Sequence, residues 1–93
     1  MIVSFLCPAT EEIHKGHKTP DLPSDIQSTA LRKLQQLHIA QTLADLKVPP
    51  GNRLEPLKGN RKGQHSIRIN DKYRLCFVWK ESGVEDVEIV DYH

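Results

Sequence analysis

The chain has 93 residues, of which 38% are hydrophobic and 27% charged, and its formal net charge at pH 7 is +1. This composition is typical of one globular domain, residues 1–93, and two cysteines are too few for a disulfide scaffold. No stretch approaches the roughly 20 apolar residues of a membrane span, and the first residues lack the features of a signal peptide. We therefore expect a cytoplasmic protein that does not contact a membrane.

The small net charge conceals two oppositely charged segments. Residues 51–80 contain eight Lys/Arg against two acids, a net charge of +6, whereas residues 81–93 contain five acids and no Lys/Arg, a net charge of −5. Residues 1–50 carry five charges of each sign. A basic segment of this density predicts a polyanionic partner, an acidic partner within the protein, or a solvated surface.

The first half of the chain predicts a short strand followed by helices. Residues 2–7 are β-prone, and residues 8–16 fit a short helix that ends at a glycine. The clearest helix begins at Ser24, which fits a capping box with Gln27. Its apolar stripe has helical spacing and consists of Ile26, Ala30, Leu34 and Leu37, and Ala40 and Ala44 continue it.

Beyond this stripe the apolar residues change sides, since Ile39, Leu43 and Leu46 lie on the opposite side of an ideal helix. Two arrangements fit this pattern. The helix breaks near His38 to give a helical hairpin, or its far half is covered on both sides; we favour the break. The segment of residues 48–51, Val-Pro-Pro-Gly, ends the helical region.

From residue 64 the hydrophobic period is two, which predicts strands at residues 64–69, 73–79 and 84–92. The second is apolar on both faces except at Arg74, so we expect it to be a central strand. The order of elements predicts an α+β fold: an antiparallel sheet of about four strands with N-terminal helices packed on one face. The other face would be basic and concave.

The register of the first hairpin can be argued from its side chains. A three-residue loop at residues 70–72 pairs Ile67 with Leu75 and places the apolar residues of both strands on one face. The same register sets Arg68 beside Arg74 on the other face. Directly opposed like charges destabilise a sheet, so this pair indicates a face that receives an anion.

The segment GNRLEPLKGNRKGQHSIRINDKYRLCFVW and the final VEIVDYH resemble the HigB-type toxins of bacterial type II toxin–antitoxin modules, in the RelE/ParE superfamily. The resemblance covers the whole chain in length and order of elements and is sharpest over residues 49–93. It implies the RelE/ParE-like microbial ribonuclease-like fold. It also implies a ribosome-dependent endoribonuclease, an mRNA interferase that cleaves translated mRNA and inhibits protein synthesis and growth.

The resemblance implies partners as well. A cognate helix-turn-helix antitoxin, HigA-like, would neutralise the toxin, and the complex would bind its promoter DNA only through the antitoxin. The ribosome and mRNA would be the targets. No cofactor is implied.

Metal-free RNA cleavage by a neighbouring 2′-hydroxyl needs a base, positive charge at the phosphorane oxygens, and an acid for the leaving 5′-oxygen. Arg74 is the best phosphate clamp, because its guanidinium offers planar bidentate donors; a salt bridge to Glu88 or Asp91 is its alternative, structural role. His93 suits acid or base work at neutral pH. The other histidines lack metal-ligand spacing, so we predict no metal.

The resemblance places the family's lysine on Lys58, its arginine on Arg74, and its C-terminal Asp-Tyr-His on the last three residues. Asp91 would orient His93 or pair with an arginine, and Tyr92 would stack on a base or position the phosphate.

Glu55 stands where some relatives have a histidine. A glutamate serves as a general base but not by the same protonation cycle, so the division of acid and base work between Glu55 and His93 stays open. Glu55 has a structural alternative as the ion-pair partner of Arg53 or Lys58. Five further cations are interpreted as phosphate contacts, which give affinity without sequence choice: Arg53, Arg61, Lys62, Arg68 and Lys72.

Two other functions are compatible with the same residues. The first is a ParE-like inhibitor that binds DNA gyrase and has no nuclease activity, since fold alone does not separate the two classes. The second is a non-catalytic RNA-binding domain, which five aromatic residues support poorly because such domains stack bases on aromatic platforms.

Overall fold

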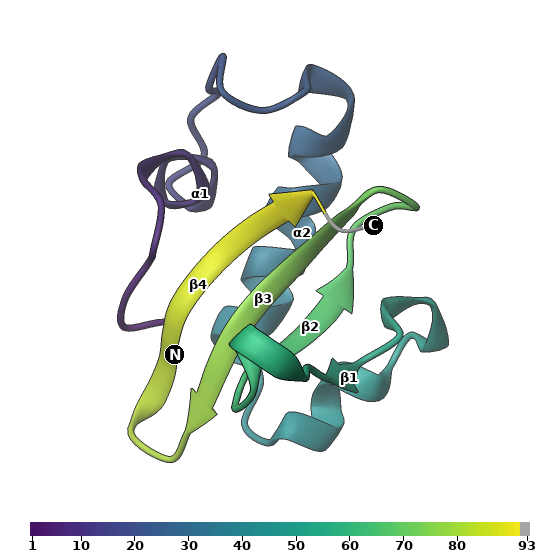
Figure 1. The fold of residues 1–93 in the computed structure, drawn as a ribbon. Helices are drawn as coiled ribbons and strands as arrows, with labels where there is room; N and C mark the ends of the chain where they lie inside the picture. The colour runs from purple at the N-terminus through teal and green to yellow at the C-terminus, as the bar shows by residue number, and fades with distance from the viewer. Residues whose placement is uncertain (92–93) are drawn as a thin grey trace.

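A computed structural model describes residues 1–91 of the chain. Two α-helices precede a four-stranded sheet (Figure 1). Two short 3₁₀ turns lie between the second helix and the first strand, and a third lies between the first and second strands. The helices are α1 (Pro8–His14) and α2 (Ser24–Ile39). The turns are η1 (Leu43–Lys47), η2 (Pro50–Asn52) and η3 (Gly59–Arg61). The strands are β1 (Glu55–Pro56), β2 (His65–Arg68), β3 (Tyr73–Lys80) and β4 (Gly83–Asp91).

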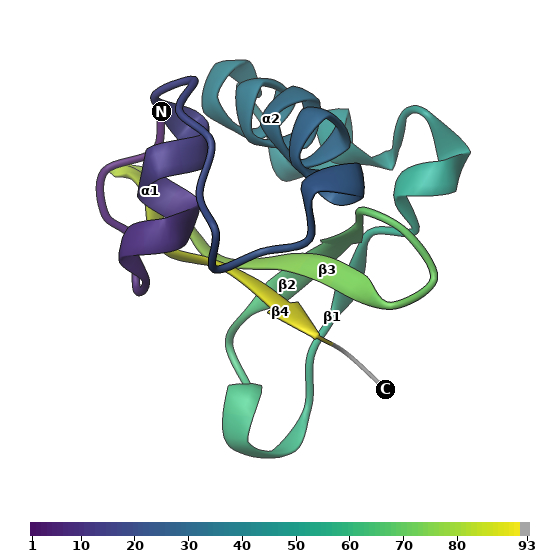
Figure 2. The same ribbon diagram turned by 90° about the horizontal axis from the view of Figure 1, so that it is seen from above.

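The sheet is an antiparallel meander with the strand order β1-β2-β3-β4, so β3 lies in its interior as expected. Both helices cover one face, here called the inner face, and the segment that contains η3 projects from the opposite, outer face (Figure 2). The α+β class with helices on one face is therefore confirmed. The concave shape expected for the outer face stays a prediction.

The β2–β3 hairpin has the register that the side chains predicted. Ile67 pairs with Leu75 and Arg68 with Arg74, and the N–H of Ile69 donates to the carbonyl of Tyr73 at 3.0 Å. The side chain of Asn70 fixes the loop, because its Oδ1 accepts the N–H groups of the two residues that close it, at 2.9 and 2.7 Å.

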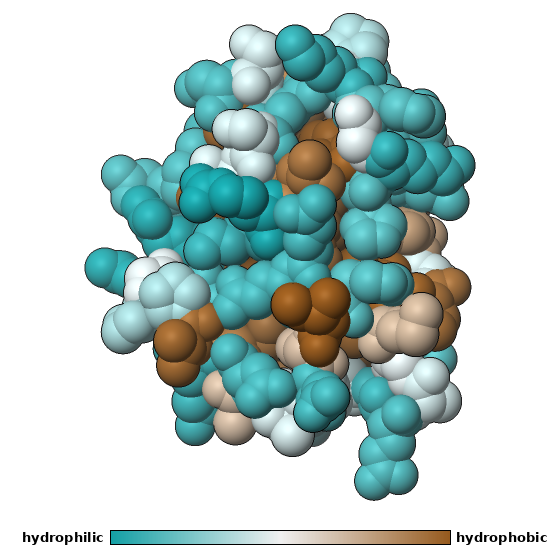
Figure 3. Space-filling model, turned by 180° about the vertical axis from the view of Figure 1, so that it is seen from behind, coloured by the Kyte–Doolittle hydropathy of each residue, from teal (hydrophilic) through white to brown (hydrophobic). Residues whose placement is uncertain are grey.

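The inner face holds the hydrophobic core. Leu75 and Phe77 of β3 and Ile67 of β2 are fully buried, and they pack with the apolar stripe of α2. Burial of such side chains contributes about 25 cal/mol per Å² of apolar surface removed from water. Seen from the helix side, the surface of the molecule is mostly hydrophilic, and some hydrophobic side chains are exposed between the hydrophilic ones (Figure 3). The stripe is buried at Ile26, Ala30, Leu34 and Leu37. Its predicted continuation is wrong, because Ala40 is the C-cap of α2 and Ala44 is exposed in η1.

The expected first strand is wrong in detail. Residues 2–7 make two isolated parallel bridges with β4, Ile2 with Val84 and Phe5 with Val87, instead of a continuous strand. The cause lies in β4, where a register shift and the left-handed conformation of Asp86 (φ 55°) interrupt the ladder between the two bridges. The segment still covers this edge of the sheet.

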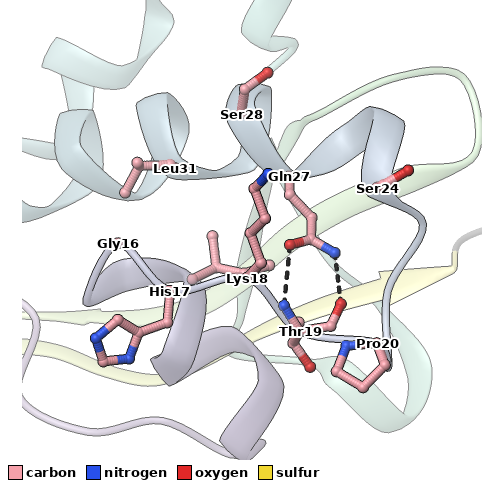
Figure 4. A pocket seen from close by; sticks show the side chains of 10 residues that line it. Gly16, His17, Lys18, Thr19, Pro20, Ser24, Gln27, Ser28 and Leu31 are labelled. Carbon is pink, nitrogen blue, oxygen red and sulfur yellow. Dashed lines mark hydrogen bonds between the residues drawn. The ribbon is translucent and has the colours of Figure 1, made fainter.

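The start of α2 differs from the expected capping box. Ser24 is the first helical residue, Pro23 occupies the N-cap position, and no side chain caps the helix. Gln27 instead holds the preceding loop: its Nε2 donates to the carbonyl of Thr19 at 2.7 Å (Figure 4). The same Nε2 donates to the carbonyl of Leu22 at 2.8 Å. The N–H and carbonyl of the buried Thr19 compete for the glutamine, since an unpaired buried peptide group is costly.

The helix ends where the apolar stripe changes sides. α2 stops at Ile39, which is exposed, and η1 then turns the chain so that Leu46 is fully buried. Thr42 caps η1, and Asp45 returns a hydrogen bond to its main chain. The break near His38 is confirmed, although a 3₁₀ turn takes the place of a second α-helix.

Candidate active site

A row of polar side chains crosses the outer face of the sheet. Glu55 of β1 pairs with Ser66 of β2, Ser66 pairs with Cys76 of β3, and Cys76 pairs with Glu88 of β4. Directly paired residues project to the same face, so the two carboxylates lie at the ends of one row. Arg74 occupies the neighbouring row, opposite Arg68, as the sequence predicted.

Arg74 is held by two oxygen acceptors. Its Nε donates to the hydroxyl of Ser66 at 2.8 Å, and its Nη2 donates to the main-chain carbonyl of Arg53 at 2.6 Å. The side chain is only 11% exposed although it carries a full charge. An arginine buried to this extent normally has partners, and here the protein supplies them from β2 and from the residue that follows η2.

The carboxylate of Glu55 is the acidic neighbour of Arg74, with Oε1 3.6 Å from Nη2. Glu55 is 48% exposed, so it lies between the buried guanidinium and solvent. The alternative partners predicted for Glu55, Arg53 and Lys58, do not form an ion pair with it among residues 1–91. The structure therefore brings together a cation suited to phosphate and a carboxylate that can accept a proton.

The acidic segment lies beside the basic segment, and its carboxylates neutralise part of the positive charge of the basic segment. Arg61 of η3 reaches Glu88 of β4 at 3.3 Å, and Lys72 reaches Asp91 at 3.6 Å. These are the two acids considered as structural partners of Arg74. A charge count along the sequence could not show this, because the pairs form only when β4 lies against β3.

Arg68 has a local partner instead. It donates to Asp71 in the hairpin loop, and this hydrogen bond holds the pKa of the Asp71 carboxyl below its usual value. Arg68 and Arg74 are paired in the sheet, but their guanidinium groups donate to different acceptors. A bound anion is not required to explain their proximity.

The remaining predicted cations are exposed. Lys58 lies at the N-cap of η3, Lys62 follows the turn, and Arg53 follows η2 with a left-handed backbone (φ 47°). Among residues 1–91 none of these three side chains forms an ion pair. They are therefore the cations that remain available to a polyanion. Tyr92 and His93 lie outside the described residues.

Other candidate groups have structural roles. His65 stacks on Phe77 with ring centroids 6.3 Å apart, so it packs against a core residue. Cys76 is fully buried, and burial raises the pKa of its thiol, which keeps it neutral and unreactive. Within residues 1–91, no group of three or more His, Cys, Asp or Glu side chains is arranged to hold a metal ion.

A cavity of about 620 Å³ lies apart from this row, between α1, the following loop and α2 (Figure 4). Ile13 and Leu31 contribute apolar surface, and Lys18 lies at its edge. None of the predicted site residues lines it. No helix of the described chain is long and apolar enough to cross a membrane.

The acceptors of Arg74 are the part of the site that was not predicted from the sequence. Ser66 lies on the same side of β2 as Arg68, and the three-residue loop sets it diagonally across from Arg74. The register therefore contained the signal for the Ser66 contact. The carbonyl of Arg53 gave none, because it depends on the path of η2.

Comparison with known proteins agrees with this architecture. Residues 10–93 match the model of a family described as the RelE-like toxin of the type II toxin–antitoxin system HigB. The chain belongs to the HigB-like toxin family. It is 53% identical over 80 residues to Toxin HigB-1 of Vibrio cholerae serotype O1, an alignment that covers 85% of this chain and 84% of that protein.

A second sequence relative is more distant, and two solved structures have a similar fold. An uncharacterized protein of Haemophilus influenzae is 32% identical over 72 residues, covering 77% of this chain and 71% of its own. The YoeB–YefM complex from Staphylococcus aureus aligns with a TM-score of 0.61 at 18% identity, over 100% of this chain and 98% of its own. The YoeB/ParE toxin from Agrobacterium tumefaciens aligns at 0.56 and 21%, over 99% and 98%.

Membership of this family confirms the function expected from the sequence at the level of class. The chain is a toxin homologue of a type II toxin–antitoxin module, and RelE-like toxins are ribosome-dependent mRNA interferases. Such a toxin has an antitoxin as its partner. The gyrase-inhibitor alternative is not favoured, because the matching family is RelE-like.

Proposed function

We propose that this toxin cleaves mRNA on the translating ribosome without a metal ion, by attack of the 2′-hydroxyl on the adjacent phosphate. The observation that carries the proposal is the pairing of Arg74 and Glu55 on the outer face, with Oε1 and Nη2 3.6 Å apart. A phosphorane and the proton of a 2′-hydroxyl need this combination of cation and acceptor close together.

The roles divide by what each group can do. Glu55, as the carboxylate of an ion pair, accepts the proton of the 2′-hydroxyl while the bond from O2′ to phosphorus forms. Arg74 and Lys58 stabilise the negative charge on the phosphorane oxygens. The bond to the 5′-oxygen then breaks, and His93 supplies the proton to that oxygen. The products are a 2′,3′-cyclic phosphate and a free 5′-hydroxyl.

The exposed cations bind the RNA backbone. Lys62 and the side chain of Arg53 contact phosphates of mRNA or ribosomal RNA. Three further cations contribute less to this binding, because each must first give up its ion pair with an acidic side chain: Arg61, Arg68 and Lys72. Asp91 orients His93, and Tyr92 stacks on a base or positions the phosphate. A HigA-like antitoxin neutralises the protein, which acts in the cytoplasm, where ribosomes are found, and binds promoter DNA only through that antitoxin.

The experiment is an in vitro translation reaction with purified protein, followed by primer extension on the mRNA. Cuts within codons that require translating ribosomes, with cyclic phosphate at the new 3′ ends, are the expected result. A message with 2′-deoxy nucleotides at the cut codon is the matched control and should resist cleavage. Cleavage of that message would contradict 2′-hydroxyl attack, and an absence of cuts would redirect attention to gyrase supercoiling.

His93 gives a second test of the same mechanism. Deletion of His93 should lower the cleavage rate at neutral pH, because the 5′-oxygen then leaves without a proton donor. General acid catalysis contributes typically 10²–10⁴-fold, and a loss of roughly that size is expected. A deletion variant that cleaves at the normal rate would overturn the role of His93 and leave that of Arg74 untouched.

A further inference from the structure

The acceptors of Arg74 define how its guanidinium is oriented. Nε donates to Ser66 at 2.8 Å and Nη2 donates to the carbonyl of Arg53 at 2.6 Å. A guanidinium is planar, so two fixed acceptors in its plane fix the direction of every N–H group that it carries. The two acceptors come from separate elements, β2 and the segment after η2.

Ser66 is well placed to orient the guanidinium of Arg74. It is fully buried in β2 between Glu55 and Cys76 of the adjacent strands, so solvent does not compete for its hydroxyl. The Nε edge of Arg74 faces this buried oxygen and is closed to a ligand as large as a phosphate. The end of the guanidinium that carries Nη1 and Nη2 is the part that a phosphate meets.

The carbonyl of Arg53 is held in place from the other side. Arg53 has a left-handed backbone (φ 47°, ψ 55°), a conformation that is uncommon for a residue with a side chain. The preceding Asn52 is fully buried, and its Nδ2 donates to the carbonyl of Leu46 and to Gln36 of α2, each at 3.1 Å. The helix layer thereby fixes the acceptor that holds Arg74 on the far side of the sheet.

We propose that Ser66 and the main-chain carbonyl of Arg53 are the positioning groups of the reaction, which make Arg74 present its Nη1–Nη2 end to the scissile phosphate. The proposal rests on the proposed function, in which Arg74 contacts that phosphate. Neither group touches RNA in this arrangement; each acts through Arg74. A misplacement of about 1 Å in such a group costs on the order of 10²-fold in rate.

The first test compares Ser66→Ala with Ser66→Thr in single-turnover cleavage of mRNA on programmed ribosomes. Ser66→Ala removes the acceptor and should slow cleavage roughly 10- to 100-fold at saturation, with little change in the half-saturating ribosome concentration. Ser66→Thr keeps the hydroxyl and should restore most of the rate. Ser4→Ala is the matched control, since it removes a serine acceptor from the N–H of Asp86, remote from Arg74.

The second test separates the main chain of Arg53 from its side chain. Arg53→Gly and Arg53→Val both remove the charge, but glycine accepts the left-handed backbone and a β-branched residue resists it. The valine variant should therefore cleave at least several-fold more slowly at saturation than the glycine variant. Equal rates for the two would show that the carbonyl does not position Arg74.

Arg74→Ala in the same assay distinguishes the two levels of failure. If Arg74→Ala cleaves normally, the proposed function fails together with the inference. If Arg74→Ala is inactive while folded Ser66→Ala, verified by melting and antitoxin binding, cleaves at the wild-type rate, the inference alone is wrong. If Ser66→Ala does not fold, the Arg53 pair decides the question by its own difference in rate.

Discussion

The two faces of the sheet are built from the same strands but solve different problems. On the inner face, Ile67, Leu75 and Phe77 are fully buried among apolar neighbours and need no specific partner. On the outer face, Ser66 is just as buried, yet its hydroxyl accepts a hydrogen bond from a charged guanidinium, that of Arg74. Apolar packing is non-directional, whereas a hydrogen bond to a charge fixes both partners in geometry.

The difference implies that the inner face sets stability and the outer face sets chemistry. Removing an inner side chain leaves a cavity that weakens the fold as a whole. Removing an outer group leaves the core intact and displaces a reacting charge. Four predictions follow this division, beginning with the change that should affect the protein most.

Phe77→Ala should cause the largest loss of stability. Phe77 is the largest of the fully buried side chains, and its truncation should lower the free energy of unfolding by about 3–5 kcal/mol. That is a large part of the roughly 5–15 kcal/mol that holds a domain of this size together. Urea denaturation measures the loss. Phe77→Leu, which leaves a smaller cavity, is the control and should lose clearly less; equal losses would show that cavity formation is not the cause.

Arg74→Ala should abolish growth arrest while the protein still folds and binds its antitoxin. Removal of one donor to a transition-state oxyanion costs roughly 10²–10³-fold in rate, and Arg74 supplies more than one donor. Cell growth after induction and cleavage on ribosomes measure the effect. Arg74→Lys keeps the charge without the planar fork and should recover little activity. Unchanged toxicity of Arg74→Ala would remove Arg74 from the mechanism.

The inner face could be predicted from the sequence because its signal is periodic. The stripe of α2 and the alternation at Ile67, Leu75 and Phe77 identified the buried positions, and the three-residue loop followed from them. The errors fell where one contact overrides a pattern. Gln27 donates to the main chain of the loop at Thr19 instead of completing a capping box. Residues 2–7 form only isolated bridges because β4 is irregular.

The outer face could be predicted only in part. Arg74 was identifiable as a charge in an apolar strand, but the charge of the segment around it was overestimated, because Arg61 and Lys72 find acids of β4. Ion pairs across distant strands leave no local pattern. The carbonyl that holds Arg74 carries no side-chain signal at all, since any residue has one; only the backbone path at Arg53 provides it.

The division between paired and unpaired cations gives the third prediction. Lys58 and Lys62 form no ion pair within residues 1–91, whereas Lys72 pairs with Asp91 at 3.6 Å. Lys58→Gln and Lys62→Gln should each reduce the slope of log affinity for ribosomes against log salt by about 0.7, the value for one phosphate on a single strand. The slope is measured from half-saturating ribosome concentrations at several salt concentrations. Lys72→Gln is the control and should change it less; an equal change would show that pairing does not matter.

The smallest effect concerns pH and the helix side of the molecule. His14 of α1 lies against His38 of α2, with ring centroids 5.1 Å apart, and the N–H of Ile2 donates to Nδ1 of His38 at 3.1 Å. Burial, followed by the proximity of His38, lowers the pKa of His14 below the ordinary histidine value of 6.5. The unfolded chain therefore binds a proton at His14 more readily than the folded chain.

The sign of the pH effect follows from this difference. Stability from His14 is fully present above about pH 6.5 and is lost as the pH falls through the lowered pKa, because protonation then favours the unfolded state. Melting temperatures measured from pH 7.5 to 5 should decline less for His14→Gln than for the wild type. Gln35→Ala, at an exposed position of α2 that does not titrate, is the control and should decline like the wild type. A His14→Gln curve parallel to that of the wild type would place the acid sensitivity elsewhere, among the carboxylates of the outer face.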